Sequence, residues 1–489
     1  MNRDRLSIIL MIFSFIVLWP HKMLPLSSLA KNDPYPIFST TYPYNYLLES
    51  TKLCLKECPC DYECACCFDY FSIAFSGIYQ KANKGRNYDR EKVPLGDLEG
   101  RWHMLGMLYG PVPVGNPNAC PNTLMNTRLG EAKQTIFGVM PNDIVPQDLI
   151  RTDSMERVGF FTVPIKYRKN GVRFEVCVQP HPDFGLMLQG GYVEIKQTLT
   201  DFIDLTPSFT ETMFLEGVQE GLAPQFTEEQ INLIQDLLMS ASSANRIFRE
   251  QGIEKRSNTV NVCDFRESSF EDLRFSLWAR HVFQLNKCCC DWPEFLLIPF
   301  FNFEGSIPGS RKLDRMNFLA APFGNNGHYS LGFTSGFHID FIETLEIGFH
   351  GGITHFFARD VDKYRLPNDP TQSGVFPFAT DVRLQPGRNS HFSVSIHAFR
   401  FLDKLSAWAE FVVVNHDEDH ITLKDPSLAS IFEVRQQECL TKFASQFITT
   451  TMNYEISPNL SLGFAAQWPL QQRNAYRSTT ILGTIKGIF

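Results

Sequence analysis

Long apolar runs are almost absent from this chain of 489 residues once its first 20 residues are passed. The longest remaining candidate, Phe295 to Phe303, is interrupted by Pro299 and Asn302 and is far shorter than the roughly 20 residues of a transmembrane helix. Only helices and closed barrels satisfy every backbone polar group inside lipid. If the mature protein sits in a membrane, we therefore expect it to cross as a closed β-barrel.

Several signatures of function are also missing. The sequence has no G-x-S-x-G, no H-E-x-x-H and no glycine-rich phosphate loop, which are the motifs of common hydrolases, metalloproteases and nucleotide-binding proteins. The net charge is -8 and the basic residues are not clustered, which argues against a nucleic-acid partner. The sequence thus predicts neither an enzyme nor a cofactor.

One cluster of acids and histidines stands out, from Asn415 to His420. Its carboxylates and imidazoles could hold a divalent cation. Long loops also collect charge without any function. We therefore favour a solvated acidic loop tip here and predict no metal site.

The N-terminus has the three parts of a secretory signal peptide. Arg3 and Arg5 form a charged start, the apolar stretch from Leu6 to Trp19 follows, and the small residues Ser28 and Ala30 define a cleavage site after Ala30. A single membrane anchor is the alternative, but the apolar stretch is too short to cross the hydrocarbon core. We predict that residues 1–30 are removed on export.

The second half of the chain alternates between apolar and polar residues. Tyr329 to Phe341 is mostly apolar at odd positions and small or polar at even ones, and Leu345 to Thr354 repeats the pattern after a tight turn at Glu343-Thr344. Two such strands joined by a tight turn make an antiparallel hairpin. Further strands are expected over 392–398, 405–413, 443–454, 460–468 and 478–489.

The connections between these strands alternate in length. The turns at 343–344, 402–404 and 457–459 are tight, whereas 358–389 and 415–439 are long and polar. Short turns at one end and long loops at the other are typical of a transmembrane β-barrel, with the short turns facing the periplasm. A soluble β-sandwich has no reason to keep that asymmetry.

The first half is less regular. Candidate strands are 70–80, 101–110, 158–167, 172–179, 185–197, 273–284 and 294–304. Together with the seven strands of the second half they predict an all-β, antiparallel up-and-down barrel of about 14 strands, within a range of roughly 12 to 16 because boundaries found in this way are imprecise.

Residues 198–268 do not fit a strand, and we predict a long insertion there. Thr227 and Gln230 have the spacing of a capping box, and Ile231, Ile234 and Leu238 follow at helical spacing. A helix of about four turns is expected, a usual length in globular proteins. We favour packing on the barrel rim, and the alternatives are that it enters the pore, caps it or binds a partner.

The last strand resembles the C-terminal recognition signal of bacterial outer-membrane β-barrel proteins. It alternates, lacks proline and ends on Phe489, with Ile485 and Ile481 at alternate positions before it, although Gly487 and Gly483 replace the large residues usual there. The resemblance also covers the signal peptide and the hairpin pattern. It implies a porin-like barrel in the outer-membrane lipid, with Ile481, Ile485 and Phe489 as the signal for the barrel assembly machinery.

Six ionisable residues on the polar strand faces are candidates for the pore lining. Charged side chains on the lipid face are unfavourable, by about 2–4 kcal/mol for Lys or Arg at the midplane, so these should point inward. There they bias ion passage through a water-filled pore, or they pair with one another and fill a closed lumen. The candidates are His338, Asp340, Glu346, His350, His397 and Glu410.

Nine of the 13 cysteines lie in two clusters. Export favours disulfides, while the alternative of a zinc or iron–sulfur site lacks the paired C-x2-C spacing. The odd total leaves one thiol free, modified or bonded to another chain, so disulfide-linked envelope proteins are candidate partners. The clustered residues are Cys54, Cys58, Cys60, Cys64, Cys66, Cys67, Cys288, Cys289 and Cys290.

We therefore expect three parts: a signal peptide at 1–30, a cysteine-rich N-terminal segment at 31–68, and a barrel at 69–489 with the insertion at 198–268. The expected function is that of a channel for passive passage of small solutes, because barrel diameter grows with strand number. The alternative is a structural or adhesive envelope barrel, cross-linked by cysteines and without a transport role.

Overall fold

The computed structural model of the chain describes residues 31–40, 70–103, 160–181, 183–201, 203–205, 264–285, 295–310, 317–341, 345–368, 372–376 and 379–489. The signal peptide, the nine clustered cysteines and the helix expected at 227–241 lie outside these residues and stay predictions. None of the described helices has the length and apolar character that a membrane-spanning helix needs.

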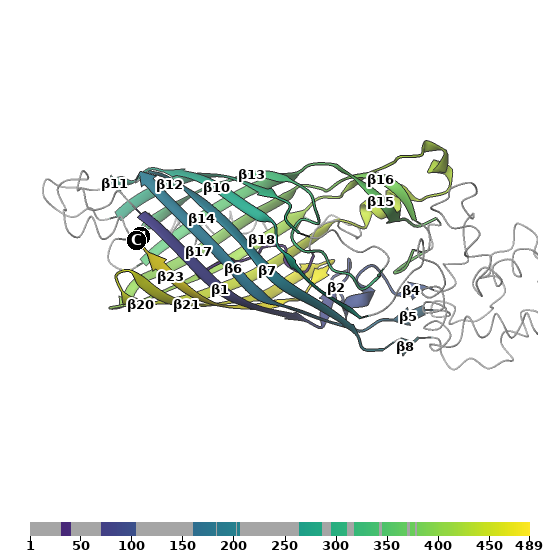
Figure 1. The fold of residues 1–489 in the computed structure, drawn as a ribbon, viewed down its shortest axis with the longest axis horizontal. Coiled ribbons are helices and arrows are strands. Elements are labelled where there is room, and N and C mark those ends of the chain that lie inside the picture. The colour runs from purple at the N-terminus through teal and green to yellow at the C-terminus, as the bar shows by residue number, and fades with distance from the viewer. Residues whose placement is uncertain are drawn as a thin grey trace, which may run out of the picture.

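The described chain forms a closed antiparallel β-barrel (Figure 1). Neighbouring strands pair in the order β10-β12-β13-β14-β17-β18-β20-β21-β23-β1-β6-β7-β9, and β7 also pairs with β10, which closes the wall. The wall strands are β1 (Tyr70–Ala82), β6 (Ile165–His181), β7 (Phe184–Leu199), β9 (Phe265–Phe270), β10 (Leu273–Arg280), β11 (Phe283–Leu285), β12 (Phe295–Ile307), β13 (Ser330–Asp340), β14 (Leu345–Phe356), β17 (Asn389–Leu402), β18 (Leu405–His416), β20 (Phe443–Ser457), β21 (Leu460–Arg473) and β23 (Thr479–Ile488).

These segments make fewer wall strands than the 14 that the sequence suggests. β9, β10 and β11 follow one another between β7 and β12 as one interrupted strand. Counted over the described residues, the wall therefore has twelve strands, the lower end of the expected range.

Two expectations in the first half were wrong. The segments 158–167 and 172–179 were expected as two strands, but all of the second and the last three residues of the first belong to the single strand β6. At its centre, Gly171 pairs with Ile78 on one side and Val193 on the other, and a Cβ on it would collide with the Tyr192 carbonyl oxygen. That glycine therefore permits a close approach of strands.

Of the expected strand 101–110 the structure describes residues 101–103, and these are not part of the wall. They contain the short strand β4 (Trp102–His103), which pairs with β5 (Phe160–Thr162), and β5 pairs with β8 (Ile203–Asp204). A second small sheet joins β2 (Lys84–Arg86), β3 (Lys92–Pro94) and β22 (Ala475–Tyr476). The short helix η2 (Leu95–Asp97) follows β3.

The two ends of the barrel differ as expected. The turns between β17 and β18, between β20 and β21 and between β6 and β7 gather at one end, near the C-terminus, which we call the short-turn end. At the opposite, long-loop end, β15 (Arg359–Arg365), β16 (Ala379–Gln385) and β19 (His420–Leu423) form a three-stranded sheet (Figure 1).

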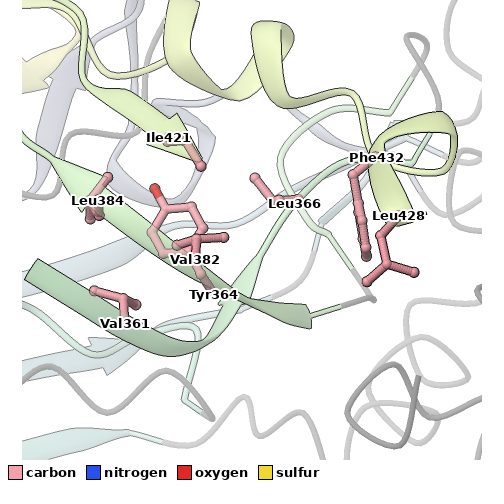
Figure 2. Close-up of a cluster of buried hydrophobic side chains, with 8 residues drawn as sticks. All are labelled: Val361, Tyr364, Leu366, Val382, Leu384, Ile421, Leu428 and Phe432. Atoms are coloured by element: carbon pink, nitrogen blue, oxygen red, sulfur yellow. The ribbon is translucent and has the colours of Figure 1, made fainter. Parts of the chain in front are cut away.

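The loops at that end were expected to be polar, yet those around this sheet are folded. Side chains of the three strands pack with η7 (Pro426–Ser430) and the turn before α8 (Val434–Cys439) (Figure 2). Leu366, Val382 and Leu384 are completely buried in it. We call this unit the cap; its apolar core comprises Val361, Tyr364, Leu366, Val382, Leu384, Ile421, Leu428 and Phe432.

The seam between the first and last wall strands closes the barrel. Ten residues of β1 pair in register with β23, and the backbones of Phe71 and Phe489 exchange two hydrogen bonds of 3.3 and 2.8 Å. The outward side chains of the closing strand include Ile481, Ile485 and Phe489. Their role as an assembly signal stays a prediction.

The outer surface of the wall is apolar. Phe75, Ile396, Phe464 and Ile485 each expose more than half of their surface, and most of the other wall strands carry outward aliphatic or aromatic residues too. Monomeric soluble proteins rarely expose a contiguous apolar area of this kind. The closed wall and its apolar exterior give the architecture of the outer-membrane β-barrel class.

Candidate functional site

The candidate site is the lumen, which the alternation of the strands makes polar. In β13, Phe333 and Phe337 face outward while Thr334, His338 and Asp340 face inward and are buried. Inward glycines make room for the larger side chains: a Cβ on Gly348 would collide with the His338 ring. The interior of this barrel is therefore mostly polar, with small apolar clusters such as Phe300 with Trp408 and Val412 with Phe447 among the polar side chains.

Residues 31–40 lie inside this lumen, and we call them the luminal segment. Its first residue, Lys31, accepts a backbone hydrogen bond from Tyr476 at the long-loop end. Its last, Thr40, donates to Asn453 Oδ1 at 2.5 Å, close to the turn that ends β20. The segment therefore runs along the barrel from the long-loop end toward the short-turn end.

A buried cluster of four charged side chains binds the luminal segment at Asp33. Asp33 Oδ2 lies 2.9 Å from Lys169 Nζ and 2.7 Å from Arg173 of β6. Glu271, between β9 and β10, binds the same two cations at 2.5 and 2.7 Å. Arg173 is completely buried, donates also to the Ile37 carbonyl oxygen at 2.5 Å and lies 4.7 Å from the centre of the Phe38 ring.

Neutral hydrogen bonds from the wall hold the rest of the segment. Gln80 and Ser478 donate to the Asn32 carbonyl oxygen at 3.2 and 3.0 Å. Trp408 Nε1 donates to the Thr40 carbonyl oxygen at 3.0 Å, and Gln467 donates to that of Tyr35 at 3.2 Å. Backbone carbonyl groups that a buried extended segment would leave without partners are thus satisfied by wall side chains.

The N-terminal end of the segment rests on an ion pair outside the wall strands. Lys31 Nζ lies 3.7 Å from Glu99, with 8% and 20% of the side chains exposed. Burial lowers the pKa of Lys31 to about 8, although Glu99 and Asp419 oppose this. Burial also raises the pKa of Glu99 to about 7 against the effect of Lys31. Both groups therefore titrate near neutral pH.

Beside the luminal segment lies a cavity of about 210 Å³. The segment forms one side of it, and β10, β12, β13, β14, β17 and β18 contribute to the other. Its lining mixes carboxylates, which include Glu304 and Glu410, with the cations Lys169 and Arg274 and with aromatic rings such as that of Trp408. At about 30 Å³ per molecule this volume matches roughly seven waters, so the lumen retains solute-sized space beside the segment.

The six candidate lining residues all face inward and are at most 3% exposed. His338 Nδ1 lies 2.6 Å from Glu346, and His397 Nδ1 lies 3.5 Å from the same carboxylate. His350 lies 3.6 Å from Glu410, which accepts hydrogen bonds from Ser393 and from Tyr35 of the luminal segment. Asp340 pairs in register with Glu346. Their part in conduction stays a prediction.

The residues that anchor the luminal segment were missed. Lys169, Arg173 and Glu175 lie on the same face of β6. Glu175 accepts a hydrogen bond from Ser39 at 2.9 Å. This pattern was missed because a break was expected near Gly171, which divided the strand in two. An unbroken strand would have placed all three inward. No comparable signal marked residues 31–40, because an extended segment without a periodic pattern looks like any linker.

The cluster from Asn415 to His420 is not a solvated loop tip, so that expectation was wrong in part. His416 and Asp419 are buried and lie 2.9 Å apart, and His416 also hydrogen-bonds Asn389 at 2.7 Å. Asp419 accepts from the Gly387 amide, which ties two long-loop connections together. Within the described residues, no group of His, Cys, Asp and Glu has the arrangement of a metal site.

Neither protein-family models nor curated proteins match the chain. Among solved structures, it is similar to an outer membrane channel from Pseudomonas putida F1, with 8% identity, a TM-score of 0.43, and coverage of 86% of this chain and 96% of that one. It is similar to the translocator domain of autotransporter NalP from Neisseria meningitidis, with 5% identity, a TM-score of 0.31, and coverage of 93% and 99%. It is also similar to the Pseudomonas putida toluene transporter TodX, with 8% identity, a TM-score of 0.28, and coverage of 96% of this chain and 98% of that one.

Proposed function

We propose that the chain is an outer-membrane channel for small solutes and that the luminal segment holds it closed in the state described here. The observation that carries this proposal is the combination of a closed wall, apolar outside and polar inside, with a separate segment and a cavity in its lumen. An interior of fixed polar side chains is what passage of water and solutes requires.

A barrel that served only as a structural element would not need this interior. The four-charge cluster and the buried His–Glu pairs carry a desolvation cost that apolar residues of similar volume avoid. A channel needs these groups because its interior is hydrated when the pore is open. This favours transport over the structural or adhesive alternative.

The proposal is tested by single-channel recording in planar bilayers. The refolded chain without its predicted signal peptide is compared with the same chain lacking residues 31–40. We expect rare, brief openings from the first and stable stepwise conductance from the second, because deletion empties the lumen of its segment. A heat-unfolded sample of each provides the baseline.

A second measurement is needed to interpret the conductance of the two chains. Different mobility of unheated and heated samples in detergent gels shows that both barrels have folded. If the deleted chain is folded in this sense yet gives no stepwise conductance at any voltage, the channel is ruled out and the structural barrel takes its place. The candidate partners, outer-membrane lipid and the barrel assembly machinery, belong to the same proposal.

A further inference from the structure

We infer that the luminal segment is a plug that can leave the lumen toward the short-turn end. Asp33 is its latch, because its ion pairs with Lys169 and Arg173 keep the segment seated. This inference rests on the proposed channel function and adds to it the residue that sets the closed state. It also specifies the end of the barrel through which the segment leaves the lumen.

The charges of the four-residue cluster balance only when the segment is in place. The wall supplies two cations, Lys169 and Arg173, and one anion, Glu271. Asp33 is the one acidic residue among positions 31–40 and brings the sum to zero. Because an uncompensated charge at a buried site is strongly unfavourable, Asp33 contributes more to seating than a neutral residue in its place could.

The other contacts of the segment suit reversible release. The donors from Gln80, Gln467 and Trp408 go to backbone carbonyl oxygens of the segment. When the segment leaves, water can enter the lumen and satisfy these same groups at little cost. The cluster differs, because loss of the Asp33 charge alone would leave two buried cations with one anion while the segment is seated, so seating is most sensitive to this residue.

Chain connectivity sets the direction of release. The segment ends at Thr40, and β1 begins at Tyr70 at the short-turn end. The 29 residues between them can reach roughly 100 Å when extended, whereas the ten-residue segment spans at most about 36 Å. If the segment left by the long-loop end, the connecting chain would still occupy the lumen. Only withdrawal toward the short-turn end empties it.

The test uses Asp33→Asn in the otherwise intact mature chain, reconstituted in lipid vesicles. Asn keeps the shape of the side chain and removes the charge. Amide hydrogen exchange over residues 31–40, read by mass spectrometry, should become at least about a hundredfold faster, the scale expected when one partner of a buried ion pair is removed. Asp362→Asn in the cap, where 81% of the side chain is exposed, is the matched control and should change nothing.

A second variant separates charge balance from the loss of a hydrogen bond. Asp33→Asn combined with Lys169→Met returns the cluster to a sum of zero, and protection of the segment should recover. Equal exchange in the parent and in Asp33→Asn overturns the latch. Failure of the double variant to recover, with the gel shift showing a folded barrel, overturns charge balance as its cause.

The direction is tested with chymotrypsin, which cleaves after Phe38 when it can reach this residue. In Asp33→Asn vesicles sorted by orientation, cleavage should occur when the protease is on the short-turn side and not when it is on the long-loop side. The opposite result overturns the direction. Fast exchange without any stepwise conductance would leave the latch standing and refute the channel function instead.

Discussion

The lumen and the cap of this protein are held together by opposite means. The cap packs eight apolar side chains into a core, as a soluble domain does. The lumen, a short distance along the same strands, holds the luminal segment by ion pairs and hydrogen bonds, with small apolar clusters such as Phe300 and Trp408 between them. Each region buries the side chains that its surroundings solvate poorly. The cap, like a soluble domain, buries apolar side chains, whereas the wall turns apolar side chains outward and encloses polar ones.

The largest expected effect comes from the cap. Phe432→Ala removes a ring that is 4% exposed and should destabilise the cap by about 3–5 kcal/mol, the usual cost of deleting a buried aromatic side chain. Amide exchange in 359–385 should rise while that in β1 and β23 stays unchanged. Equal loss of protection in the wall would show that the cap and barrel form one cooperative unit, which contradicts the comparison.

Substitutions on the outer face of the wall should destabilise the barrel when they introduce charge and not when they change only the size of an apolar side chain. Phe75 is 59% exposed near the middle of β1, so Phe75→Arg places a cation on the lipid side at a cost of about 2–4 kcal/mol. Unfolding by urea in vesicles measures it. Phe75→Leu, which keeps the surface apolar, is the control. If the two variants unfolded alike, the apolar band would not face lipid.

A smaller effect is expected for one of the neutral hydrogen bonds to the luminal segment, at the Thr40 carbonyl oxygen, which also accepts from Asn453 Nδ2 at 3.1 Å. Trp408→Phe removes the Nε1–H donor to the Thr40 carbonyl oxygen and should weaken seating by about 1 kcal/mol. Amide exchange over residues 31–40 should accelerate about fivefold. Trp468→Phe, on the outer face, provides the comparison. An unchanged rate in Trp408→Phe would mean that the bond does not contribute to seating.

The smallest effect concerns pH. Since the pKa of Glu99 is raised from 4.5 to about 7 in the folded protein, its carboxylate weakens the folded state above pH 7, and this penalty is lost as pH falls from 7 to 4.5. The folded protein should therefore become more stable as pH falls over that window, which the urea midpoint of unfolding measures. In Glu99→Gln this part of the pH dependence should vanish, while Glu91→Gln, at an exposed site, should keep it.

The lowered pKa of Lys31 produces a second pH dependence, in the seating of the luminal segment, above neutral pH. Its charged form is disfavoured when seated, and this penalty is lost as pH rises from about 8 to 10.5. Amide exchange of the segment, corrected for the intrinsic dependence on pH, measures the Lys31 window, and the urea midpoint measures that of Glu99. A flat profile in the parent chain would show that the two groups stay hydrated.

Most of the wall could be predicted because strand periodicity is local. The strands expected over 329–341 and 345–354 are β13 and β14, and the expected hairpins over 392–413 and 443–468 also match the structure within a few residues. The inward direction of His338 and Glu410 followed from the same alternation, since one face of each strand meets lipid. Strands in the first half were harder, because Gly171 serves a close approach that only the neighbouring strand reveals.

The sequence by itself determined which face of each strand is apolar, and with it the closed barrel, because backbone groups in lipid must pair within a closed sheet. It did not determine what fills the lumen. Asp33 and Arg173 are 140 residues apart in the chain, and only the folded wall brings them to 2.7 Å. The tertiary structure decided that residues 31–40 enter the lumen, because charge balance and hydrogen bonding there depend on side chains from β1, β6, β18, β20 and β21 at once.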